Sequence, residues 1–78
     1  MKTMTCRQLG GACDLAFHAD TFEEMAELSK QHGMEMHRQQ DAAHLEAMGN
    51  MQALMQEPDA MEKWFQARRA EFEALPND

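Results

Sequence analysis

The chain is short and acidic: it has 78 residues, with 7 Lys or Arg against 14 Asp or Glu, and a formal net charge of −7. This length corresponds to one small domain, residues 1–78, whose core is too small to enclose a deep catalytic cleft, so we expect a protein that is not an enzyme. The negative charge argues against nucleic acid and membranes as partners, because both nucleic acid and anionic membrane surfaces bind concentrated positive charge.

The N-terminal part of the chain predicts a short β-hairpin. We expect its strands over residues 2–6 and 12–18, where apolar side chains alternate with polar ones. Gly10 and Gly11 supply the turn between them, because glycine adopts positive φ without a steric penalty.

A helix follows the hairpin. Thr21 and Glu24 have the spacing of a capping box, which predicts a helix that begins near Phe22. The apolar side chains of this helix fall on one stripe, as expected for a helix that packs on a small sheet. Gly33 lies late in the helix, where we expect it to loosen or end the helix.

The rest of the chain predicts two more helices. The first runs from Asp41 to about Gln56, and Pro58 marks a break before the second, because proline suits the first helical turn and not the interior. We expect a methionine-rich face of one helix to pack against an aromatic stripe of the other. The two sets are His44, Met48, Met51 and Met55, and Met61, Trp64, Phe65, Phe72 and Leu75. The predicted fold class is therefore α+β: a β-hairpin packed on a helix (ββα, zinc-finger-like) over residues 1–37, then a helical hairpin over residues 38–78.

Two cysteines and two histidines form the candidate chemical site. Cys6 and Cys13 are separated by six residues across the hairpin, and His32 and His37 by four residues near the end of the first helix. Zn²⁺ takes two thiolates and two imidazoles in a closed tetrahedron, so we predict one zinc-like ion that these four residues hold mainly for structure. On an ideal helix, positions 32 and 37 point about 140° apart. His18, at the end of the second strand, is therefore the alternative fourth ligand.

Other hypotheses compete with a structural zinc site. The cysteines also fit ordinary small buried side chains or a disulfide, although thiols stay mostly reduced in the cytoplasm, where we place a chain without a signal-peptide-like apolar run. Met34 and Met36 lie between the two histidines, and the stripe of His44, Met48, Met51 and Met55 is also rich in thioether, a donor that suits Cu(I). A second hypothesis is therefore a metal-handling protein that buffers zinc or carries Cu(I). A third hypothesis is a metal-free, Met-rich helical interaction module. His44 follows the predicted site, and we expect it at the surface or in the core.

The cysteine pair, the capping box and the histidine pair, at their separations, resemble a bacterial family of predicted small metal-binding proteins, a domain of unknown function. The resemblance covers about residues 1–50, and the first 37 carry it. It implies a metal site but no established reaction. The residues that match the family pattern are Cys6, Cys13, His32 and His37. We expect the folded domain, as a monomer or a homodimer, to contact a protein partner that the sequence does not identify.

Overall fold

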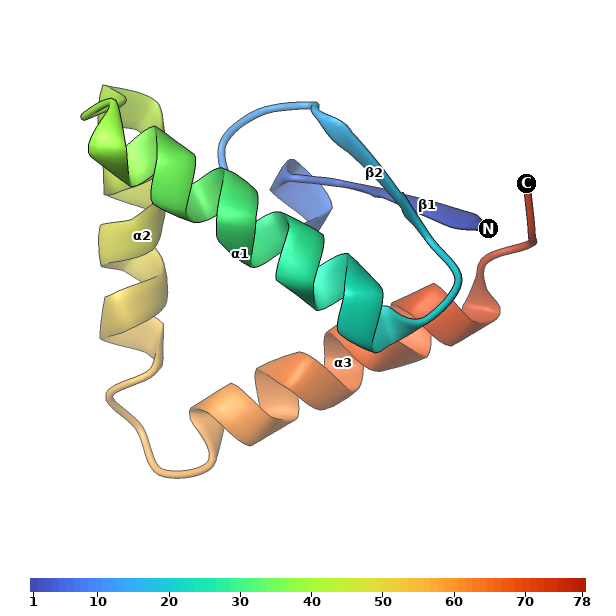
Figure 1. Cartoon of the computed structure of the whole chain (residues 1–78). Helices are drawn as coiled ribbons and strands as arrows, with labels where there is room; N and C mark the ends of the chain where they lie inside the picture. Colours follow the sequence, from blue (N-terminus) through green and yellow to red (C-terminus); the bar gives the residue numbers. More distant parts are fainter.

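A computed structural model describes all 78 residues, and it has the predicted α+β fold class, with an N-terminal hairpin followed by three α-helices (Figure 1). The elements are β1 (Lys2–Thr5), the 3₁₀ turn η1 (Arg7–Leu9), β2 (Ala16–Ala19), α1 (Phe22–Arg38), α2 (Ala42–Leu54) and α3 (Ala60–Ala74). None of the helices combines the length and the hydrophobicity that crossing a membrane requires.

The hairpin is antiparallel and shorter than predicted. Lys2 pairs with Ala19 and Thr5 with Ala16, so the second strand begins at Ala16 and the predicted strand over 12–18 is wrong in its first half. The strands are joined by a longer loop, residues 6–15, in which η1 turns inward and buries a leucine side chain in the core.

Helix α1 begins where the sequence predicts but ends later than predicted. The Thr21 hydroxyl accepts a hydrogen bond from the Glu24 N–H at 3.2 Å, so the predicted helix start is confirmed. The helix does not end at Gly33, where an added Cβ would lie 3.8 Å from the Met48 methyl group in ordinary contact. It continues to Arg38 and is followed by a reversal of the chain at Gln40, which has φ 60°.

The hydrophobic core lies between the hairpin, η1, the first turns of α1 and the last turns of α3. The Phe22 and Phe72 rings meet edge to face with centroids 5.9 Å apart. The core side chains are Met4, Cys6, Leu9, Phe17, Ala19, Phe22, Met25 and Phe72. No residue of α2 belongs to this core.

The predicted aromatic stripe of α3 is buried only at its C-terminal end. Phe72 is 2% exposed, whereas Phe65 and Met61, about two and three helical turns earlier, are 43% and 56% exposed. The expectation that the whole stripe packs inward is therefore wrong for Met61 and Phe65, whereas Trp64 is half-buried and lies, like Met51 of α2, against Gly10. The first half of α3 lies outside the core because α3 packs against α1 near its own C-terminal end, where Phe72 meets Phe22.

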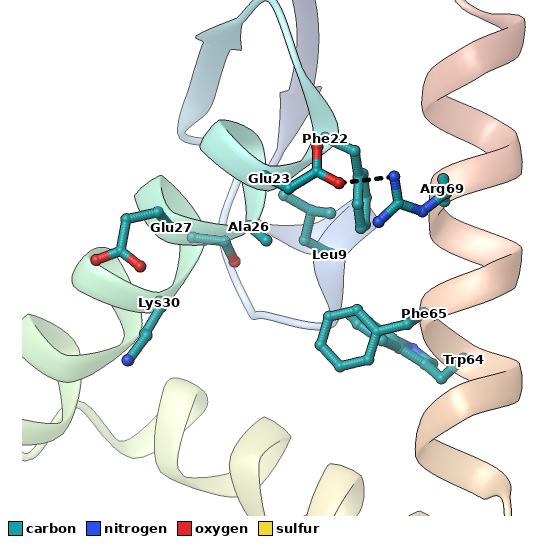
Figure 2. A pocket seen from close by; sticks show the side chains of 10 residues that line it. Leu9, Phe22, Glu23, Ala26, Glu27, Lys30, Trp64, Phe65 and Arg69 are labelled. Carbon is teal, nitrogen blue, oxygen red and sulfur yellow. Dashed lines mark ion pairs between the residues drawn. The ribbon is translucent and has the colours of Figure 1, made fainter.

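A cavity of about 520 Å³ separates α1 from the first half of α3 (Figure 2). Phe22, Trp64 and Phe65 supply aromatic walls. An ion pair of 2.8 Å between Glu23 and Arg69 bridges the two helices. Both charged groups are at least half exposed, so this bridge orients the helices more than it stabilises the fold.

Substitutions in α3 test where the core ends. We expect Phe72→Ala to lower the free energy of unfolding by about 3–5 kcal/mol, because it empties a buried aromatic site. Phe65→Ala makes the same chemical change at an exposed position of the same helix and should cost less than half as much. Urea denaturation followed by circular dichroism measures both values. Equal losses would contradict the assigned core.

Candidate metal centre

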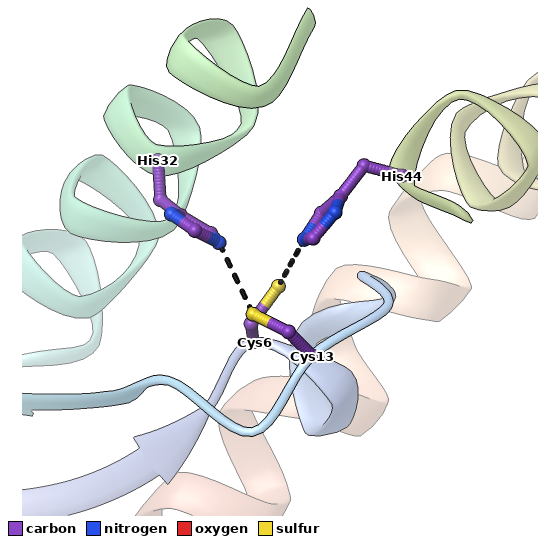
Figure 3. Close-up of side chains that lie close together, drawn as sticks. All are labelled: Cys6, Cys13, His32 and His44. Carbon is purple, nitrogen blue, oxygen red and sulfur yellow. Dashed lines mark hydrogen bonds between the residues drawn. The ribbon is translucent and has the colours of Figure 1, made fainter. Parts of the chain in front are cut away.

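Two thiols and two imidazoles from distant parts of the chain converge beside the hairpin loop (Figure 3). Cys6 and Cys13 belong to that loop, His32 to α1 and His44 to the first turn of α2. One ligand atom from each lies within 4.8 Å of all the others. The four side chains are therefore close enough to bind one metal ion.

The distances within the cluster match those around a tetrahedral ion. The Cys13 sulfur lies 3.4 Å from His32 Nε2, and the Cys6 sulfur lies 3.6 Å from His44 Nε2. Zinc bonds of about 2.3 Å to sulfur and about 2.0 Å to nitrogen, at tetrahedral angles, separate such atoms by about 3.5 Å. Two of the four sulfur–nitrogen pairs thus already have the spacing of a tetrahedron's edge.

Backbone hydrogen bonds hold the two cysteines next to each other. The Cys6 N–H donates to the Leu15 carbonyl at 2.8 Å, and the Arg7 N–H donates to the Cys13 carbonyl at 2.9 Å. These bonds continue the strand pairing beyond the ends of β1 and β2. Backbone hydrogen bonds therefore fix the positions of both cysteines where the loop leaves the sheet.

Glycine is required at position 11 because the chain passes over the Cys6 side chain there. The Gly11 N–H donates to the Cys6 carbonyl at 2.8 Å. A Cβ on Gly11 would lie 2.1 Å from the Cys6 sulfur, far inside van der Waals contact. Gly10, just before it, has φ 95°, a conformation that favours glycine. The glycine pair thus shapes a loop around a sulfur atom.

His32 belongs to the inward-facing stripe of α1. Its ring is half-buried and meets the Phe17 ring of β2 edge to face, with centroids 5.6 Å apart. It also meets the His44 ring at 5.2 Å and 81°. These contacts direct the imidazole toward the loop cysteines (Figure 3).

His44 is the only buried polar or charged residue of the chain, at 6% exposed. Asp41, the N-cap of α2, accepts a hydrogen bond from the His44 N–H at 3.1 Å, and its carboxylate lies 2.6 Å from Nδ1. In the neutral ring, Nδ1–H donates to the carboxylate and the Nε2 lone pair faces the sulfurs. A carboxylate behind a histidine in this way is a common second shell of metal sites.

The surroundings of the two thiols shift their pKa values in opposite directions. Burial raises the pKa of the Cys6 thiol, against the effect of the Cys13 backbone N–H. The pKa of the Cys13 thiol is lowered, chiefly by a hydrogen bond from the Leu15 backbone N–H. The pKa of His44 is raised, first by its hydrogen bond to Asp41, whose own pKa the same contact lowers. Backbone N–H groups near sulfur favour the thiolate, which is the form that binds metals.

The structure brings together Cys6, Cys13 and His32 of the predicted ligands, but neither His37 nor His18 joins them. His37 is exposed in the last turn of α1, on a different side of the helix from His32, as the angle of about 140° requires. His18 is exposed on β2, and its Nδ1 lies 2.9 Å from the Thr3 hydroxyl. Both cysteines are free thiols, not a disulfide.

The fourth member of the cluster, His44, was expected outside the site. It lies on the same helical face as Met48, Met51 and Met55, which is the face that α2 turns toward α1 and the loop. One local signal could have drawn attention to it: Asp41 precedes it by three residues, the spacing of an N-cap whose carboxylate also reaches the ring.

No known protein family, curated protein or solved structure matches this chain. Membership of the bacterial small metal-binding family therefore stays a prediction from the residues quoted above. The convergence of four ligand side chains carries the functional argument instead.

Two glycines offer a matched test of the loop. Gly11→Ala should displace the Cys6 sulfur and weaken binding of Co²⁺, a spectroscopic substitute for Zn²⁺, by at least about tenfold, since second-shell changes typically cost 10–100-fold. Gly49→Ala in α2 meets nothing within 4 Å and should leave the Co²⁺ affinity unchanged while stabilising the helix. Unchanged affinity in Gly11→Ala would show that the loop does not position a ligand.

Proposed function

We propose that this chain is a small metal-binding protein that holds one Zn²⁺ ion, mainly for structure, through Cys6, Cys13, His32 and His44. The observation that carries the proposal is the group of four ligand atoms within 4.8 Å of one another, contributed by the loop, α1 and α2. Two thiolates and two imidazoles are the donor set of structural zinc sites.

The number of protein ligands supports a structural role. Four side chains complete a tetrahedron and leave no position for a reactive water, whereas catalytic zinc sites keep one position open. Cys6 and His44 are also nearly inaccessible, at 4% and 6% exposed. No enzymatic activity is part of the proposal.

The position of α2 indicates how a bound ion would stabilise the fold. His44 is the only buried side chain of α2, and this helix contributes nothing to the hydrophobic core. An ion bound to His44, His32 and the loop cysteines would connect α2 to the rest of the domain. Structural zinc contributes on the order of 10 kcal/mol to the folding of small domains, which is comparable to their whole stability.

The charge of the loaded protein and the redox state of its thiols bear on its partners and its compartment. Two thiolates offset the charge of one Zn²⁺, so the loaded protein keeps the formal charge of −7 and remains a poor ligand for nucleic acid. Thiolate ligands need a reducing compartment, and we place the protein in the cytoplasm. We expect an accessory role in which the stabilised domain contacts another protein.

Replacing single histidines tests the ligand set. We expect His44→Ala to lower the Zn²⁺ affinity more than about 100-fold, because it removes a direct ligand, whose loss should exceed the 10–100-fold cost of a second-shell change. His37→Ala, at an exposed position, should bind one Zn²⁺ per chain as tightly as the unchanged protein. Competition with a chelator of known affinity measures both. The reverse order would restore His37 as the ligand, and a folded protein that binds no Zn²⁺ would end the proposal.

Chelation tests the structural role. We expect amide hydrogen exchange to accelerate first in α2 when a chelator removes the ion, because that helix has no other buried side chain. Amides of β2 and the first turns of α1, which contact the hydrophobic core, should keep more protection. Exchange measured by mass spectrometry on the full chain, with and without Zn²⁺, distinguishes the regions. Unchanged protection of α2 would contradict a structural role for the ion.

A further inference from the structure

A second feature adjoins the Cys/His cluster and shares part of its wall with the proposed zinc site. A cavity of about 360 Å³ lies between η1, α1 and α2. Cys6, His32 and His44 form part of its wall, so three members of the cluster also border this cavity. Cys13 does not line it.

Thioether side chains form much of the wall on the α2 side of this cavity. Met48, Met51 and Met55 line the cavity from α2, at the three- and four-residue spacings that place side chains on one face of a helix. The wall contains no carboxylate and no Lys or Arg. It therefore offers sulfur donors, two imidazoles and apolar surface, and no oxygen-rich set of the kind that hard cations prefer.

These three methionines differ from those that fill the core. Met4 and Met25 are 1% and 0% exposed and belong to the hydrophobic core. The cavity methionines are only half-buried and lie outside that core. Core packing, the usual role of methionine, thus accounts for the first pair. Of the α2 group, Met51 lies near the Trp64 ring, at Gly10, and outside the hydrophobic core.

The methionine face approaches the cysteine loop at the two glycines. A Cβ on Gly10 would lie 3.3 Å from the Met51 sulfur, and a Cβ on Gly11 would lie 2.1 Å from the Cys6 sulfur. A thioether sulfur and a thiol sulfur therefore lie against neighbouring residues of one loop. Met51 and Cys6, which carry these two sulfur atoms, both line the cavity.

We propose that this cavity is a second metal site, for a soft monovalent cation of the Cu(I) class, in which the thioethers of Met48, Met51 and Met55 bind the ion beside the Cys6 sulfur. Thioether and thiolate ligands select Cu(I) over harder divalent ions. The site shares Cys6 with the proposed zinc centre, but its selectivity depends on the methionines and not on His32 or Cys13.

Replacing the cavity methionines by leucine tests this site with little change in volume. The variant Met48→Leu/Met51→Leu/Met55→Leu and the unchanged protein, both loaded with Zn²⁺, compete anaerobically with a colorimetric chelator for Cu(I). We expect the triple variant to bind Cu(I) at least tenfold more weakly and Zn²⁺ with unchanged affinity. The control Met34→Leu/Met61→Leu replaces methionines that are 59% and 56% exposed and lie off the cavity, and it should bind Cu(I) as the unchanged protein does.

Nuclear magnetic resonance of methyl-labelled methionine gives a second measurement that does not depend on affinity. Adding Ag(I), a redox-stable substitute for Cu(I), should shift the methyl signals of the three cavity methionines and leave those of Met34 and Met61 in place. Equal Cu(I) affinity in the triple variant, or Ag(I) shifts spread over exposed methionines, would overturn the second site. Zinc stoichiometry, measured on the same samples, reports separately on the first site.

Discussion

The contact between the Cys6 side chain and the loop that passes over it is the constraint on which the rest of this structure depends. Cys6 is both a member of the hydrophobic core and a member of the Cys/His cluster, so the core and the candidate site meet at one side chain. The loop follows the sulfur so closely that position 11 accommodates only glycine. Strand pairing beyond β1 and β2 then brings Cys13 to the same place.

The distribution of burial explains why a metal ion suits this fold. Only 9 of 78 residues are buried, and eight of them form a core that excludes α2. A domain this small has little hydrophobic free energy in excess of its conformational entropy. The one helix that contributes no residue to this core is also the helix that supplies His44, so an ion bound to that residue would tie α2 to the rest of the domain.

The sequence supported the correct fold class and three of the four clustered side chains, and the errors have physical causes. The helix start after Thr21 and the break at Pro58 are local, and both are confirmed. The hairpin prediction failed from 12 to 15 because burial of a leucine by η1 outweighed regular strand pairing. The histidine pair predicts His37 as a ligand because histidine ligands are often three to five residues apart, although the helical angle of about 140° argues against it.

The sequence by itself determined the donor set of this protein: two cysteines placed around a glycine pair, a capped helix that presents His32, and too small a core for a chain of this length. Only the tertiary structure decided which histidine completes the cluster. The chain reverses after α1 at Gln40, and Asp41 both starts α2 and fixes the ring of His44. Proximity across a reversal depends on the angle between two helices, and no residue spacing encodes that angle.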